Sequence, residues 1–491
     1  MPHSTYNDDA LESGYQVERK PLVLPETYRF RTRWQKNLYS LWELVRPTIL
    51  TPDKDNHEAP PLRPTAYLDG LRGFAALIVY WGHHQLWARD VIGAGAILEN
   101  AWGYENRWYF VCLPGIRLFF SGGHLAVTVF FVMSGYVLSA KPLNLIQNAD
   151  YIKLQDNLGS ALFRRWLRLY IPVICTTFIY MTSWHLFGIW TATPDHKGTY
   201  SEELWNYYIE FKNFSFVFRG GGNDWFTYNF HAWSIPVEFR GSIIIYTALA
   251  AFSRCTRNAR LLCILALIYY FMYIADGAHY AMFMTGLLLC DLDLLAQKGN
   301  LPNFFHRFAS HKKAIFYTLF AVGIYLGGVP SNKQDIQLLH DSPGWRALAH
   351  LKPQAVFDFK WFYLYWASLF IVSSIPRIPT LKRFFECRFC QYLGRISFAF
   401  YLVHGPVLWI LGDRLYVAAG WAREIHGGTL PGWINLFPMS KAGPLGLEFS
   451  FLVPHLIILP VTLWCGEIAT RLFDEPSVRF SQWLYRLTTT T

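Results

Sequence analysis

Apolar stretches of about twenty residues recur along most of the chain, separated by shorter polar segments. A helix of this length crosses the hydrocarbon core of a bilayer, so each stretch predicts a transmembrane helix. The pattern therefore predicts an all-α fold, a polytopic membrane helix bundle. About ten such stretches occur, at residues 67–88, 123–140, 167–190, 233–252, 259–275, 278–296, 314–330, 357–375, 392–411 and 449–472.

The same pattern divides the chain into three parts. Residues 1–60 are polar and rich in proline, and they predict a cytosolic tail. Residues 61–480 hold all the apolar stretches and predict one transmembrane domain, which a short C-terminal tail follows at 481–491.

Lysine and arginine gather in alternate connections, and this asymmetry predicts the orientation of the bundle. They are concentrated at both ends of the chain and in the connections 141–168, 253–260, 297–313 and 376–390. Because cytoplasmic segments carry the excess of positive charge, both termini are predicted to be cytosolic. The chain is thus expected to be a multi-pass protein of an endomembrane or the plasma membrane, in contact with membrane lipid.

Composition and charge narrow the classes of protein further. Of the 491 residues, 53% are hydrophobic and only 16% are charged, against about 25% charged residues in soluble domains. The net charge of +10 is spread over short clusters in the connections, so no nucleic-acid partner is expected. Cys387 and Cys390 form one CxxC pair, whereas a structural zinc ion needs about four ligands, so no metal site is predicted.

Ionisable residues inside the first apolar stretch are candidates for function, because burying such groups in a membrane is costly. Arg72 and His83 lie about 20° apart around a helix and about 16 Å apart along it, so they share one face. Asp69 lies near the same face and could pair with Arg72 or cap the helix. His84 lies about 100° away from His83 and is expected to face another helix, with no role in the site.

Five segments together resemble the acyltransferase 3 family of integral membrane O-acyltransferases, and the aromatic, loop-rich style is similar to fungal members. Arg72 and His83, with ten residues between them, match the family's arginine and histidine signature. The other segments follow in the family's order: FFVMSGYVLS at 130–139, RRWLRLYIP at 164–172, HAWSIPVEF at 231–239 and GRISFAFYLVHGPV at 394–407.

The resemblance implies transfer of an acyl group, commonly acetyl from acetyl-CoA, to a hydroxyl group of a sugar, glycan or secondary metabolite. It also implies that His83 is catalytic. Independently of the family, attack of an alcohol on a thioester needs a base, and a histidine suits this task. His83 could instead carry the acyl group as a covalent intermediate, and the sequence leaves both routes open.

Three arginines are the candidates for binding acyl-CoA, because its phosphates call for guanidinium groups. These are Arg72, Arg165 and Arg168, all predicted near the cytoplasmic side. The alternative is that Arg165 and Arg168 only set the orientation of their helix, since basic clusters mark cytoplasmic helix ends.

Further candidates for the catalytic site lie on the fourth and ninth stretches. Glu238 is predicted near the outer end of the fourth stretch, where it could orient His83 or bind the acceptor, or form an ion pair with another helix. Ser397, Tyr401 and His404 form one polar stripe. Tyr401 and His404 are expected near the site, and Ser397 is expected to be structural.

Two other functions compete with the acyltransferase. A transporter or proton-coupled permease would also place Arg, His and Glu within the membrane. A membrane scaffold could keep the fold without the chemistry. The pair of Arg72 and His83 and the five matched segments favour the enzyme, with acyl-CoA and a hydroxyl-bearing small molecule or glycan as its partners.

Overall fold

A computed structural model describes residues 46–47, 62–218 and 225–489. Within these ranges every regular element is helical, as the hydrophobic pattern predicts. The predicted cytosolic tail, residues 1–60, lies outside the described residues except for 46–47.

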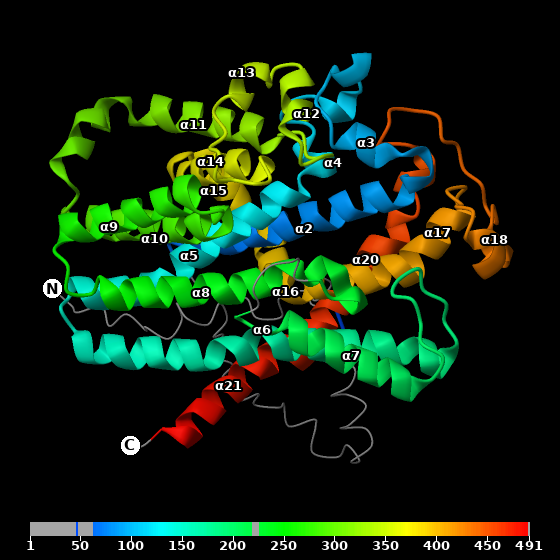
Figure 1. Cartoon of the computed structure of the whole chain (residues 1–491), viewed down its shortest axis with the longest axis horizontal. Helices are drawn as coiled ribbons and strands as arrows, with labels where there is room; N and C mark the ends of the chain where they lie inside the picture. Colours follow the sequence, from blue (N-terminus) through cyan, green and yellow to red (C-terminus); the bar gives the residue numbers. More distant parts are fainter. Residues whose placement is uncertain (1–45, 48–61, 219–224, 490–491) are drawn as a thin grey trace, which may run out of the picture.

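Each predicted apolar stretch coincides with a helix. The corresponding helices are α2 (Ala66–Ala88), α5 (Gly123–Gln147), α6 (Tyr151–Phe187), α8 (Ser234–Ala251), α9 (Arg257–Tyr269), α10 (Ala278–Gln297), α11 (Lys312–Gly327), α14 (Lys360–Ser374), α16 (Arg388–Val407) and α20 (His455–Ala469). Figure 1 shows α2, α5, α6, α8 and α10 running along the long axis of the molecule.

Shorter elements connect and extend these helices. The α-helical ones are α3 (Ala94–Leu98), α4 (Leu118–Ser121), α7 (Tyr200–Phe214), α12 (Ile336–Asp341), α13 (Arg346–Ala349), α15 (Pro379–Phe385), α17 (Asp413–Ala418), α18 (His426–Thr429), α19 (Phe449–Leu452) and α21 (Glu475–Thr488). Turns of π-helix, η8 (Tyr270–Ile274), η11 (Leu408–Gly412) and η13 (Thr470–Asp474), extend α9, α16 and α20. The 3-10 turns are η4 (Asp90–Ile92), η5 (Tyr104–Asn106), η6 (Phe110–Cys112), η7 (Thr227–Trp233), η9 (Asn303–His311), η10 (Ile375–Arg377) and η12 (Pro431–Trp433).

Five helical segments of the described chain are long and apolar enough to cross a membrane by length and composition. They are Gly123–Gln147, Arg257–Ile274, Ala278–Gln297, Arg388–Ala418 and Phe449–Thr488. The larger count of about ten crossings and the cytosolic position of both termini stay predictions.

Close contacts at glycine build the centre of the bundle, where α2 packs against α5 and α16, and α5 against α10. A Cβ added at Gly73 of α2 would lie 2.2 Å from the backbone nitrogen of Gly394 on α16. A Cβ at Gly135 of α5 would lie 2.0 Å from the carbonyl oxygen of Phe283 on α10. Only glycine allows these backbones to approach so closely, so the glycines of three matched segments are packing residues.

Three helices, α6, α7 and α21, lie partly or wholly outside the predicted apolar stretches. Helix α6 begins at Tyr151 and has 37 residues, about 55 Å of helix. It is longer than predicted because a polar helical segment precedes the apolar stretch that begins near residue 167. Helix α7 lies in the connection between the third and fourth predicted stretches, and a capping box of Thr199 and Glu202 begins it. Helix α21 continues past residue 480, where the C-terminal tail was predicted to start.

Candidate active site: a cluster of three histidines

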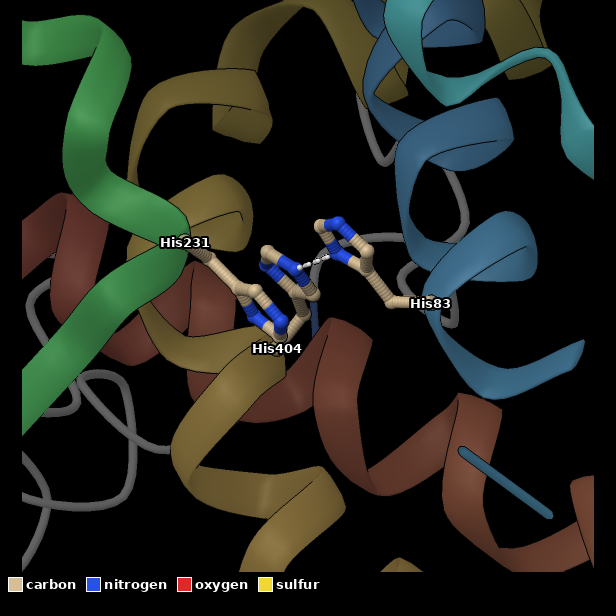
Figure 2. Close-up of side chains that lie close together, drawn as sticks. All are labelled: His83, His231 and His404. Carbon is tan, nitrogen blue, oxygen red and sulfur yellow. Dashed lines mark hydrogen bonds between the residues drawn. The ribbon is translucent and has the colours of Figure 1, made fainter. Parts of the chain in front are cut away.

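Three histidines from different parts of the chain meet near the C-terminal ends of α2 and α16. His83 comes from α2, His404 from α16 and His231 from η7, directly before α8, and Figure 2 shows the three rings facing one another. Their nearest ring nitrogens all lie within 4.8 Å of one another. His404 and His231 are buried, at 1% and 5% exposure, whereas His83 is half-buried.

A chain of hydrogen bonds sets the tautomers of two of these rings. Nδ1 of His404 lies 2.6 Å from the carbonyl oxygen of Tyr401, which can only accept, so this nitrogen carries the proton. Nε2 of a neutral His404 is then an acceptor, and Nδ1 of His83, 2.8 Å away, donates to it. A neutral His83 consequently has its lone pair on Nε2.

His231 contacts the other two rings by stacking. Its ring is parallel to that of His83 within 7° at a centroid distance of 3.7 Å, and parallel to that of His404 within 7° at 4.8 Å. Burial, together with the neighbouring His83 and His404, lowers the pKa of His231 well below its usual value, so this ring is neutral near pH 7.

Two hydrogen bonds hold η7, and with it His231, against α16. Pro406 has no N–H to donate to the carbonyl of Leu402 one turn earlier, and the side-chain amide of Asn229 donates to this carbonyl instead, at 2.9 Å. The hydroxyl of Tyr401 donates to the carbonyl of His231. Ser234 lies 2.8 Å from the same hydroxyl and can donate to it.

The arrangement of the rings suits proton sharing better than metal binding. A nitrogen lone pair lies in the plane of its ring, so two stacked, parallel rings cannot direct lone pairs at one ion about 2.0–2.1 Å from each nitrogen. His83 and His231 are stacked in this way. The facing nitrogens of His83 and His404 already lie at the hydrogen-bonding distance of 2.8 Å.

Glu238 and Arg165 form an ion pair, although the sequence placed them at opposite ends of the bundle. The predicted separation of the two residues is wrong because α6 begins well before its apolar part. Arg165 therefore lies in the middle of α6 and not at its end. Ser134 of α5 donates to the same carboxylate at 2.5 Å, and Arg165 also donates to Ser242 at 2.7 Å. Three of the matched segments thus meet at Glu238.

The remaining arginine candidates lie near the carboxylates of Asp69 and Asp474. Arg72 donates to the carbonyl of Gly394 at 3.1 Å and lies 3.4 Å from Asp69, which is one of the two interactions expected for Asp69. Both Arg72 and Arg168 interact electrostatically with Asp474. Since the side chain of Arg72 is 34% exposed, its guanidinium can contact a ligand while it remains anchored to α16.

The expectation that Arg72 and His83 share one face of α2 is confirmed. Arg72 contacts Gly394 and His83 contacts His404, and both partners belong to α16. Ser397 donates to the carbonyl of Gly394 within the same helix. His84 faces away from the cluster and contacts Tyr416 of α17 at 2.7 Å.

His231 is the member of the cluster that the sequence analysis did not assign. It begins the matched segment HAWSIPVEF, but it precedes the predicted fourth span, so helical spacing gave it no face in common with His83. Its place in the matched segment and at the border of an apolar stretch were the signals that could have identified it.

Comparisons with known proteins agree with the resemblance. A protein family described as an acyltransferase domain matches residues 65–448. Three similar proteins come from fungi. The O-acetyltransferase PaAT-1 of Phomopsis amygdali is 29% identical over 92% of this chain and 93% of its own length.

The other two are more distant. Acyltransferase R4 of a Phoma species is 24% identical over 76% of this chain and 88% of its own length. Acyltransferase clz18 of Cochliobolus lunatus is 22% identical over 86% of this chain and 96% of its own length. No solved structure matches the chain significantly.

Proposed function

The chain belongs to the acyltransferase domain family, and on this premise we propose that it transfers an acetyl group from acetyl-CoA to a hydroxyl group of a small molecule or glycan. The family and the similarity to an O-acetyltransferase make it an acyltransferase and a membrane protein rather than a permease or a scaffold. The proposal adds the multi-pass topology, the donor, the class of acceptor and the roles of the residues.

The observation that carries the mechanism is the free lone pair on Nε2 of His83, which follows from its bond to His404. In the proposed reaction Nε2 takes the proton of the acceptor hydroxyl as the oxygen attacks the thioester carbonyl. The carbon–sulfur bond breaks, and His83 returns the proton to the thiolate. The products are the O-acetyl ester and free CoA, with no net change in protons.

His404 orients and stabilises the base. When Nε2 of His83 is protonated, the positive charge is shared through the Nδ1–H bond to His404, which the carbonyl of Tyr401 holds in place. Catalytic bases are commonly oriented in this way by a third group. Tyr401 contacts His404 through its backbone carbonyl and the backbone of His231 through its hydroxyl, so we assign it a positioning role.

The donor site proposed here uses the arginines around Asp474. Arg72 and Arg168 would contact phosphates of CoA, since guanidinium groups bind phosphate with paired hydrogen bonds. Arg165 would act differently, because its guanidinium already pairs with Glu238. The pair would hold α5, α6 and α8 together beside the path of the donor.

The same lone pair on His83 would also serve the covalent route. In that route Nε2 attacks the thioester directly, CoA leaves, and the acceptor hydroxyl then attacks the acyl-imidazole. Radiolabelled acetyl-CoA separates the two routes, because only the covalent one labels the protein when no acceptor is present.

The test is the release of CoA from acetyl-CoA by purified protein in detergent, with thermal stability recorded for every variant. We expect the wild type to release CoA slowly and His83→Ala to lose about a thousandfold in rate. His84→Gln is the matched control, since this neighbouring histidine belongs to a separate network.

A folded His83→Ala protein that keeps the wild-type rate would exclude His83 as the base. A wild type that neither releases CoA nor gains thermal stability from acetyl-CoA would remove this donor from the proposal.

A further inference from the structure

A row of aromatic rings leads from the surface of the molecule to His83. Trp225 is 52% exposed and stacks on Phe230 at 5.4 Å, with the rings parallel within 9°. Phe230 contacts His231 at 4.3 Å between centroids, and His231 stacks on His83. We call Trp225, Phe230, Trp409 and His231 the aromatic wall.

Trp409, on the π-helical turn η11, contacts both Phe230 and His231 of the aromatic wall. Its ring lies 4.9 Å from Phe230 and 5.1 Å from His231. The turn follows directly on the helix that carries His404, and π-helical turns are frequent at functional sites. The wall therefore continues the proposed active site towards the surface.

Three polar atoms of this region are buried without a hydrogen-bond partner among the described residues. They are the indole N–H of Trp409, Nδ1 of His231 and the side-chain oxygen of Asn229. Buried polar groups are normally paired, because an unpaired one is costly. A ligand with few polar atoms could pair them, above all by accepting a hydrogen bond from Trp409.

The carboxylates of α7 that contact η7 already accept hydrogen bonds within the protein, so they are not free for a ligand rich in hydroxyls. Glu203 accepts from Tyr228 and from the backbone of Lys197. Glu210 accepts from the backbone and hydroxyl of Thr227. A sugar needs many such partners at once, whereas the wall offers mainly apolar ring faces.

We infer that the acceptor is a rigid, largely apolar alcohol with fused rings and a carbonyl or ether oxygen, which lies along the aromatic wall with its hydroxyl at His83. This inference rests on the proposed function and names its class of acceptor. The ring faces of Trp225 and Phe230 would hold the apolar body, and the N–H of Trp409 would donate to the oxygen.

The test compares defined acceptors on the purified full-length protein with acetyl-CoA as donor. Testosterone has fused rings, one hydroxyl and a distant ketone, 5α-androstan-17β-ol lacks the ketone, and methyl α-D-glucopyranoside represents sugars. We expect kcat/KM to be at least about tenfold higher for testosterone than for the glucoside. The steroid without the ketone should fall in between.

Two variants locate the acceptor on the wall. Trp225→Ala should raise the KM for testosterone about tenfold with a smaller change in kcat, because ring contact is lost. Trp225→Phe should restore most of this loss. Trp409→Phe keeps an aromatic ring, although a smaller one, and removes the N–H, so it should abolish the preference for the steroid with the ketone.

Trp205→Ala is the matched control. Trp205 is also an exposed tryptophan, at 64%, but it lies on α7 and contacts Tyr208 with the two rings tilted by 34°, so its loss should leave all kinetic constants unchanged.

Faster acetylation of the glucoside, or equal effects of Trp225→Ala and Trp205→Ala, would overturn this inference. Either result is compatible with the proposed acyltransferase function as long as His83-dependent release of CoA persists. Loss of that release in the wild type would instead count against the proposed function.

Discussion

Two adjacent histidines of α2 belong to two networks that are chemically alike and differ in access. His83 bonds to His404, which donates to the carbonyl of Tyr401. His84 bonds to Tyr416, which lies 3.3 Å from His455, and His455 donates to the carbonyl of Phe451. In each network a backbone carbonyl fixes the tautomer of a histidine.

The surroundings separate the two networks. His83 is half-buried where η7, α2 and α16 meet, so this residue keeps some exposure. His84 is 0% exposed, and its Nε2 is buried. Beside it, Arg89 forms a buried ion pair with Glu448. The comparison shows that a hydrogen-bonded histidine becomes a candidate catalyst only where the fold leaves its other nitrogen accessible.

The largest effect should come from Arg89→Met, a change beside the buried network of His84. The side chain of Arg89 is buried against Glu448, Gln85 and the ring of Phe451. Its loss leaves the buried carboxylate of Glu448 without its charge partner, which costs about 3–5 kcal/mol. Thermal unfolding in detergent should show a clear fall in Tm.

The double variant Arg89→Met with Glu448→Leu should recover most of this loss, since no charge then remains buried. If the single variant is as stable as the wild type, the ion pair of Arg89 and Glu448 does not stabilise the fold.

The next largest effect should come from a change in the network of His83. His404→Ala removes the acceptor for Nδ1–H of His83, and we expect kcat to fall about a hundredfold. His404→Gln should keep more activity, because its amide oxygen can accept the same hydrogen bond. Equal rates for the two variants, with unchanged thermal stability, would show that the bond does not support catalysis.

The smallest effect should come from Tyr416→Phe in the buried network of His84. It removes the hydroxyl between His84 and His455 and leaves two buried nitrogens unpaired, at a cost of about 1–3 kcal/mol. Tm should fall, while kcat stays within about threefold of the wild type. A fall in kcat as large as that of His404→Ala would mean that the two histidine networks are coupled.

Much of the fold could be predicted from the sequence, because the length of an apolar stretch and the period of a helix are local properties. The helices at 66–88 and 278–297 begin and end within a residue or two of the predicted stretches. The polar half of α6 and the whole of α7 were missed, since neither is apolar enough to stand out, although the capping box of Thr199 and Glu202 was present.

The candidate site was predictable only in part. The period of the helix placed Arg72 and His83 on one face, and both contact α16. It could not show that His404 is the partner of His83, that His231 stacks on it, or that Arg165 pairs with Glu238. These pairs are far apart in the sequence, and no local pattern relates the rotation of one helix to that of another.

The sequence by itself determined the class of protein, the positions of the helices and the histidine with the most probable chemistry, because hydrophobicity and residue type act over short distances. Tertiary structure decided which of two neighbouring histidines has an accessible nitrogen. The physical reason is that η7, α2 and α16 come from distant parts of the chain. Their packing, through Pro406, Asn229 and Tyr401, fixes the hydrogen bonds that leave Nε2 of His83 free.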